Sequence, residues 1–390
     1  MTPSSNHYDA IVVGARCAGA STAMLLARHG LKVLVADSGR YGTDTLSTHA
    51  LMRGAVLQLA HWGLLEKLVA AGTPPIRTTS FYYGEEQIEV LIKPADGVDA
   101  LYAPRRTVLD SLLADAARES GAELLYQTRL VDLLRAPETG RVIGAVLQDS
   151  LGQKHQVRAD RVIGADGIRS TVASLAGAEI RRQALHSAAT VFAYWSGLNI
   201  EGYHWHFSLG AAAGAIPTND GLTVVFVGTP SERFHEEIGS DVAVGYQRTL
   251  EACAPGLARA TSNGQRETKF RRFVNGAGFL RKCWGPGWAL VGDAGFFRDP
   301  IIAHGITDAL RDAELLTRAI VRGTDHALAN YEAARDSLAL NLFELSDEIA
   351  SFDWSLDQLK EKHIRLSKEM NREVKALTIL HASAGQEAVA

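Results

Sequence analysis

The order of apolar and polar positions predicts that the chain begins with a β-α-β unit. Residues 8–13 are a short apolar run, residues 20–29 are rich in small residues, and residues 31–36 are apolar again. Short apolar runs on either side of a helical segment are typical of parallel strands joined by a crossover helix. We therefore expect a strand, a helix and a strand in this order, with Asp37 at the end of the second strand.

Helical periodicity and strand-like alternation recur along the rest of the chain. We expect one long helix that begins near Arg53 and ends at Gly72, and a second helix that follows Pro104 and ends at Gly121. Strands are expected over residues 76–103, over four runs between residues 122 and 165, and over the β-rich residues 178–280; helices are expected after Gly305 and from residue 326 nearly to the end.

A glycine turn joins the first strand to the first helix. It runs from Gly14 to Gly19, and Asp37 follows about twenty residues on. This arrangement predicts a dinucleotide site, in which the diphosphate lies at the helix N-terminus and the acid accepts from a ribose hydroxyl. Arg16 stands where the fingerprint has its second glycine, and its side chain could neutralise a phosphate or pair with Asp37.

Two further segments have the same design, a strand that delivers an acid to a glycine-containing loop at the start of a helix. The first is Gly164-Ala-Asp166-Gly167, and the second is Gly292-Asp293, followed by Pro300 and Gly305. Such loops place a carboxylate beside sugar hydroxyls while backbone amides face an oxygen-rich group. An unrelated β-α-β turn is therefore disfavoured, and we expect the three segments to meet on one cofactor.

Composition limits the other functional classes. The 390 residues are 46% hydrophobic and 22% charged, and 40 Lys and Arg stand against 44 Asp and Glu. There is no basic field for nucleic acid. No secretory leader or long apolar run is evident, so we expect a cytoplasmic protein. Cys17, Cys253 and Cys283 have no metal-ligand spacing, and no metal site is expected.

With these motifs in this order, the chain resembles the single-component FAD-dependent monooxygenases of the para-hydroxybenzoate hydroxylase type. It also resembles their relatives, the geranylgeranyl reductases and the flavin-dependent halogenases. The resemblance implies an α/β fold: a Rossmann-like FAD-binding domain with a parallel sheet and a β-meander, a β-sheet substrate domain and a C-terminal helical extension. The implied boundaries are 1–75, 101–177 and 281–325 for the FAD domain, 76–100 and 178–280 for the substrate domain, and 326–390 for the extension.

The resemblance also implies non-covalent FAD, with NADPH or NADH as the electron donor. Oxygen would add to the C4a carbon of the reduced flavin and pass to a small apolar or aromatic substrate by hydroxylation or epoxidation. A reductase of C=C bonds and a redox sensor without turnover are the alternatives. The implied cofactor residues are Gly14, Ala15, Arg16, Cys17, Ala18, Gly19, Asp37, Ser38, Arg53, Arg106, Val131, Asp166, Gly167, Gly292, Asp293, Pro300, Gly305 and Ile306.

Catalytic candidates lie in the loops expected around the flavin. His304 and Pro300 belong to the loop after Asp293, and His49 precedes the second helix. An imidazole with an ordinary pKa near 6.5 suits proton transfer. An alternative of equal weight is that His304 is a helix N-terminal residue that is exposed to solvent or hydrogen-bonded to the backbone. Halogenases carry a Trp-x-Trp-x-Ile-Pro motif near residues 212–217; both tryptophans are missing here, which disfavours halogenation.

Two patterns have competing interpretations. Aromatic residues between positions 192 and 226 form either an ordinary core or the wall of an apolar pocket. The basic residues of the last helix could bind a membrane surface, but the interleaved Glu361, Glu369 and Glu373 favour an ordinary solvated face. Membrane association is therefore not expected, and the sequence carries no signal for an oligomeric state.

Overall fold

A computed structural model describes residues 3–5, 7–239, 241–274 and 276–387. Its first sheet has the parallel strand order β18-β8-β1-β2-β5, with β17 as an antiparallel edge strand. The central strands are almost wholly buried, which explains their uninterrupted apolar sequence. The bounds are β1 His7–Val13, β2 Val33–Asp37, β5 Glu123–Tyr126, β8 Lys154–Gly164, β17 Trp284–Gly285 and β18 Trp288–Leu290.

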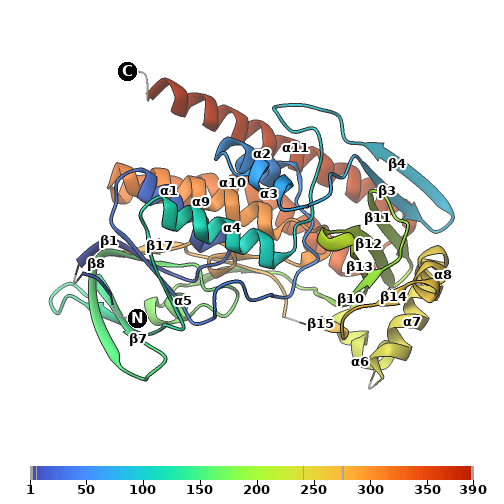
Figure 1. Cartoon of the computed structure of the whole chain (residues 1–390), viewed down its shortest axis with the longest axis horizontal. Coiled ribbons are helices and arrows are strands. Elements are labelled where there is room, and N and C mark those ends of the chain that lie inside the picture. Colours follow the sequence, from blue (N-terminus) through green and yellow to red (C-terminus); the bar gives the residue numbers. More distant parts are fainter. Residues whose placement is uncertain (1–2, 6, 240, 275, 388–390) are drawn as a thin grey trace.

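Three helices pack together over this sheet, namely α1 (Cys17–Arg28), α4 (Arg106–Glu119) and α9 (Gly305–Arg322) (Figure 1). β6 (Arg129–Arg135) and β7 (Val142–Gln148) form an antiparallel meander with the first half of β8. α5 (Thr171–Ala176) follows β8. Crossover helices and a meander on one parallel sheet confirm the predicted α/β fold class.

The second large sheet has the order β14-β10-β13-β12-β11-β3-β4, with β15 also paired to β10. Its strands come from two separate stretches of the chain, so β3 lies parallel to β11 although more than 100 residues separate them. The bounds are β3 Thr78–Tyr83, β4 Glu86–Leu91, β10 Ala188–Ser196, β11 Tyr203–Ser208, β12 Ala211–Pro217, β13 Thr223–Pro230, β14 Gln265–Arg266 and β15 Arg271–Val274.

The two faces of the second sheet pack against different partners. On β10, Val191, Ala193 and Trp195 join a core with α6 (Phe234–Glu237), α7 (Val242–Cys253) and α8 (Pro255–Asn263), whereas Phe192 and Tyr194 belong to the main core. This alternation follows from the two-residue period of a strand. A small third sheet joins β9 (Ile180–Gln183), β16 (Phe279–Arg281) and β19 (Phe296–Phe297).

One helical prediction was wrong in detail. The long helix expected after Arg53 is divided into α2 (Arg53–His61) and α3 (Leu65–Ala70), because Gly63 has a φ of +74° that a helix does not allow. The C-terminal region is helical, as predicted, and consists of α10 (Asp325–Ala350) and α11 (Leu356–Glu387), separated by a turn in which Phe352 has a φ of +53°.

α11 extends along the molecule from the edge of the second sheet to the helices over the first sheet (Figure 1). Its beginning contacts the second sheet, where Tyr83 Oη lies 2.7 Å from His363 Nδ1, and its later part packs on α2. None of the helices in the described part of the chain is long and apolar enough to span a membrane.

Candidate functional site

A cavity of about 710 Å³ lies among the three glycine-and-acid motifs and one face of the second sheet. This volume is within the usual range for ligand and cofactor sites. Many of the residues expected at the cofactor meet here although they are distant in sequence. The predicted residues that line the cavity are Gly14, Arg16, Cys17, Ala18, Asp37, Ser38, His49, Arg106, Asp166, Gly167, Asp293, Pro300, Gly305 and Ile306.

The glycine turn brings the N-terminus of α1 to the cavity. Gly14 has a φ of +105°, and a Cβ there would lie 2.4 Å from the carbonyl oxygen of Ala165, so only glycine fits. Asp37 accepts hydrogen bonds from the backbone N–H of Ala15 at 2.7 Å and of Gly39 at 2.6 Å. The carboxylate thus fixes the turn and still lines the cavity, where its remaining acceptor sites suit a ribose hydroxyl.

Arg16 pairs with Asp110 on α4, so the suggested ion pair with Asp37 was wrong. Its Nη1 lies 3.1 Å from Asp110 Oδ2, and Arg106 donates to the same carboxylate from Nε at 3.0 Å and from Nη2 at 2.9 Å. The thiol of Cys17 also donates to Asp110. Asp110 therefore holds two guanidiniums beside the N-terminus of α1, a combination suited to a diphosphate.

Two acids of the later motifs line the cavity, and burial raises the pKa of both carboxyl groups. Asp166 accepts from the hydroxyl of Ser170 and from the backbone N–H of Thr171, so its carboxylate fixes its own loop. Burial and the nearby Asp308 raise the pKa of Asp293 to about 7, although Arg106 opposes the shift. Hydroxyl groups that donate to Asp293 would favour its charged form, as expected of an acid that binds a polyol.

The N-terminus of α9 forms another part of the cavity lining. Pro300 begins a short 3-10 turn, and Gly305 and Ile306 begin the helix. A Cβ on Gly305 would meet no atom within 4 Å, so the absent side chain leaves space. Backbone amides at a helix N-terminus attract an oxygen-rich edge. These features, with Asp37 and the two guanidiniums, fit the diphosphate, the hydroxyls and the ring of an FAD, which these residues would hold.

Aromatic side chains from the second sheet form another wall of the cavity. Phe192, Trp205 and Phe226 line it, whereas Trp195 is on the opposite face of the sheet. Of the two positions where halogenases carry tryptophan, Ala212 lines the cavity and Gly214 is packed so closely that a Cβ would lie 2.5 Å from the Phe226 ring. The structure thus provides an apolar wall in the same cavity as the cofactor motifs.

Some of the predicted residues lie outside the cavity lining. Arg53 donates to the backbone carbonyls of Lys93 and Val98, so it fixes a loop. Val131 is not part of the cavity lining, whereas its neighbour Leu130 is, and the pairing of β6 with β7 has a register shift between Leu130 and Asp132. Ala15, Gly19 and Gly292 contribute backbone or close packing beneath the lining. His304 is also absent from the lining.

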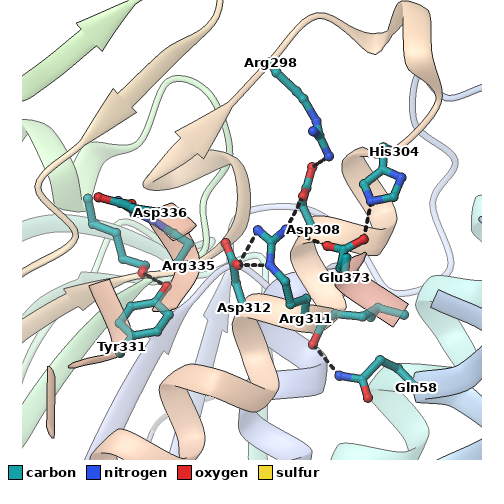
Figure 2. A network of polar contacts seen from close by, with 12 residues as sticks. Gln58, Arg298, His304, Asp308, Arg311, Asp312, Tyr331, Arg335, Asp336 and Glu373 are labelled. Atoms are coloured by element: carbon teal, nitrogen blue, oxygen red, sulfur yellow. Dashed lines mark hydrogen bonds and ion pairs between the residues drawn. The ribbon is translucent and has the colours of Figure 1, made fainter. Parts of the chain in front are cut away.

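His304 faces the C-terminal helix. Its Nε2 lies 2.6 Å from Glu373 Oε2, and Glu373 Oε1 accepts from Arg311 at 2.7 Å (Figure 2). Arg311 also pairs with Asp308, which pairs in turn with Arg298. Glu373 is completely buried, so its interpretation as part of a solvated face was wrong. The network ties α11 to the loop that begins α9.

The group His304, Asp308 and Glu373 is compact enough to hold a metal ion. The guanidiniums of Arg298 and Arg311 already neutralise both carboxylates, however, and a cation would have to displace them. We therefore interpret this group as an ion-pair network and propose no metal there.

Sequence reasoning missed residues whose role depends on distant contacts. Asp110, on the helix after Pro104, was not singled out, and neither were Arg169 and Arg298, although both arginines line the cavity. The position of Arg169 two residues after Gly167 was the one local signal that could have identified it.

The fold and the site define an α/β flavoprotein. The chain belongs to the FAD binding domain family, whose model matches residues 7–346. It is therefore an FAD-dependent oxidoreductase, as the motifs predicted.

Relatives and solved structures support this assignment without fixing the reaction. The chain is 24% identical over 340 residues to a 1H-pyrrole-2-carbonyl-[peptidyl-carrier protein] brominase of Pseudoalteromonas luteoviolacea, covering 82% of this chain and 78% of the brominase. It is 25% identical over 372 residues to digeranylgeranylglycerophospholipid reductase 1 of Methanococcoides burtonii, covering 88% and 86%. A probable FAD-dependent monooxygenase from Pseudomonas aeruginosa superposes with a TM-score of 0.78 at 21% identity, covering 94% of this chain and 100% of that structure.

Proposed function

We propose that this chain is an FAD-dependent monooxygenase that uses NADPH or NADH and O2 to hydroxylate or epoxidise a small apolar or aromatic compound. The observation that supports this most is that one cavity is lined both by the cofactor motifs and by Phe192, Trp205 and Phe226. An apolar compound against that wall would lie beside the predicted flavin ring. The P. aeruginosa protein has been solved in complex with 2-aminobenzoylacetate, a small aromatic compound.

Each part of the site has a role in this proposal. The N-terminus of α1, Arg16 and Arg106 bind the diphosphate, Asp37 binds the ribose, and Asp293 binds the ribitol. FAD, when bound, accepts a hydride from the nicotinamide and reacts with O2 once reduced. Phe296 and Phe297 are buried in the loop that would cover the ring, so this loop keeps water away from it.

The three residues that the sequence suggested for catalysis have different roles in this proposal. Pro300 fixes the backbone of the flavin loop, because its ring restricts φ. His304 holds the start of α9 through Glu373 rather than facing the substrate. His49, which lines the cavity, is the imidazole placed to meet a ligand directly.

Two related reactions compete with this proposal. A brominase needs a site for an oxidised halogen, and the absence of both tryptophans at Ala212 and Gly214 disfavours it. A reductase of C=C bonds, as in the M. burtonii relative, would use the same apolar wall without O2. A cytoplasmic location remains our expectation for either enzyme.

The discriminating experiment measures NADPH and NADH oxidation by the FAD-loaded protein with a panel of two-ring aromatic compounds. We expect at least one compound to stimulate oxidation in air and to gain one oxygen atom, with no product under argon. Product that continues to form under argon would indicate a reductase. Product that requires bromide would indicate a halogenase, and the absence of any stimulation would favour a redox sensor.

A further inference from the structure

His49 has an unusual combination of backbone and side-chain features. Its φ is +70°, a region that non-glycine residues seldom occupy, and only 1% of its surface is exposed. It nevertheless lines the cavity. Strained, buried residues at a cavity wall are often held there for a function, because the surrounding contacts must offset the strain.

One nitrogen of this imidazole is satisfied and the other is not. Nε2 is hydrogen-bonded to the hydroxyl of Tyr194, and the centres of the two rings are 5.6 Å apart. Nδ1 is buried and has no hydrogen-bond partner among the described residues. A buried polar atom without a partner is costly, and a ligand group is one way to satisfy it.

The protonation of the pair identifies the orphan nitrogen as a donor. Burial and the charges of Arg106, Arg105 and Arg271 lower the pKa of His49 well below its usual value, so the ring is neutral. Burial also raises the pKa of Tyr194 to about 12, so its hydroxyl keeps its proton. The other group that hydrogen-bonds to that hydroxyl is the Arg105 guanidinium, which can only donate. The hydroxyl therefore donates its own proton to Nε2 of His49, and Nδ1 carries the hydrogen.

The loop that carries His49 is fixed in place. Asp44 pairs with Arg271 at 2.9 Å and with Arg105 at 3.6 Å, and both guanidiniums lie near the Tyr194 ring, at 4.9 Å for Arg105 and 5.9 Å for Arg271. Asp44 offsets part of this positive charge. The remaining field favours an electron-rich acceptor beside His49.

We propose that the Nδ1–H of His49 is the donor of a substrate subsite for a planar, largely apolar compound that carries one acceptor oxygen, a carbonyl or a deprotonated hydroxyl. Tyr194 is the positioning residue that fixes the tautomer. Phe192, Trp205 and Phe226 receive the apolar body. Only the description of this ligand as the substrate rests on the proposed function.

A matched ligand pair tests the subsite. 1-Indanone and indane share one skeleton, and only 1-indanone has a carbonyl acceptor. The FAD-loaded full chain should bind 1-indanone about five- to tenfold more tightly than indane, measured by titration calorimetry without NADPH or NADH. Equal binding of the two compounds, or binding of neither, would overturn the proposal.

Three variants separate the donor from the fold. His49→Asn keeps an N–H donor close to the Nδ1 position and tolerates a positive φ, so most of the preference should remain. His49→Gln moves the amide towards the Nε2 position and should abolish it. Tyr194→Phe keeps the shape of the core but removes the hydroxyl that fixes the His49 tautomer. The preference for 1-indanone over indane should then fall by about half or more, and 15N spectra should show both His49 tautomers.

Each contrary result contradicts a specific step. A preference that survives in both His49→Gln and Tyr194→Phe would exclude His49 as the donor. A loss of FAD affinity in His49→Gln with an unchanged 1-indanone preference would assign the donor to the cofactor. If the subsite behaves as expected but no compound is oxygenated, the proposed function fails while the subsite stands.

Discussion

Replacing Glu373 by alanine is expected to lower the free energy of unfolding by about 3–5 kcal/mol, because it removes one partner of a buried ion pair with Arg311 and the hydrogen-bond partner of His304 Nε2. Glu373 is fully buried between His304 and Arg311, and Arg311 is itself fully buried. Chemical denaturation of the apo protein measures the change. Glu369→Ala is the matched control, since Glu369 lies one turn earlier on α11 and pairs with Arg372 near the surface; it should cost less than about 1 kcal/mol.

The pH dependence of this effect has a definite sign. His304 and Arg311 lower the pKa of Glu373 to about 2, against about 4.3 in an unfolded chain. The stabilisation is therefore complete above about pH 4.3 and is lost as the pH falls towards 2. The difference between the parent and Glu373→Ala should shrink over that window, and a constant difference would contradict the ion-pair explanation.

Replacing Asp293 by alanine is expected to weaken FAD binding by about tenfold or more, because ribitol hydroxyls would lose a charge-assisted acceptor worth roughly 1.5–3 kcal/mol. Quenching of flavin fluorescence measures the affinity. Asp160→Ala serves as the control, since Asp160 is exposed on β8 and does not line the cavity. Unchanged affinity in Asp293→Ala would show that this acid is not at the cofactor.

The same variant has a second signature without FAD. Because the pKa of Asp293 is raised to about 7, the folded protein keeps a proton that the unfolded chain loses near pH 4. The free energy of unfolding of the parent should therefore fall as the pH rises from about 4 to about 7. Asp293→Ala should show a shallower fall over this range.

The local parts of the fold were predictable because their signals lie within a few residues. β1, the Gly14 turn and β2 follow from one run of apolar residues and glycines, and Gly292-Asp293 follows from another. Each glycine motif faces the cavity because parallel strands present their carboxyl ends at the same edge of the sheet. Gly63 was overlooked because apolar periodicity continues across it, although its backbone ends the helix.

The remaining parts depend on contacts between distant residues. Glu373 meets His304 across 69 positions, and its neighbours Glu369 and Arg372 have the charge pattern of a solvated helix. Tyr194 meets His49 across 145 positions, and its strand pattern is the same in a core or a pocket wall. Asp110 is similar, since an acid on an amphipathic helix has no local sign that two arginines will converge on it. Burial and partner identity are tertiary properties that periodicity does not encode.

The reaction of the reduced enzyme with oxygen tests the central claim most directly. FAD-loaded protein would be reduced under anaerobic conditions and mixed rapidly with oxygenated buffer while absorbance spectra are recorded. A monooxygenase is expected to pass through a species whose spectrum is neither that of reduced nor that of oxidised FAD, and a bound substrate should shorten its lifetime. A single-step return to the oxidised spectrum with every compound tested, together with product formation in the absence of oxygen, would contradict the account and identify a reductase.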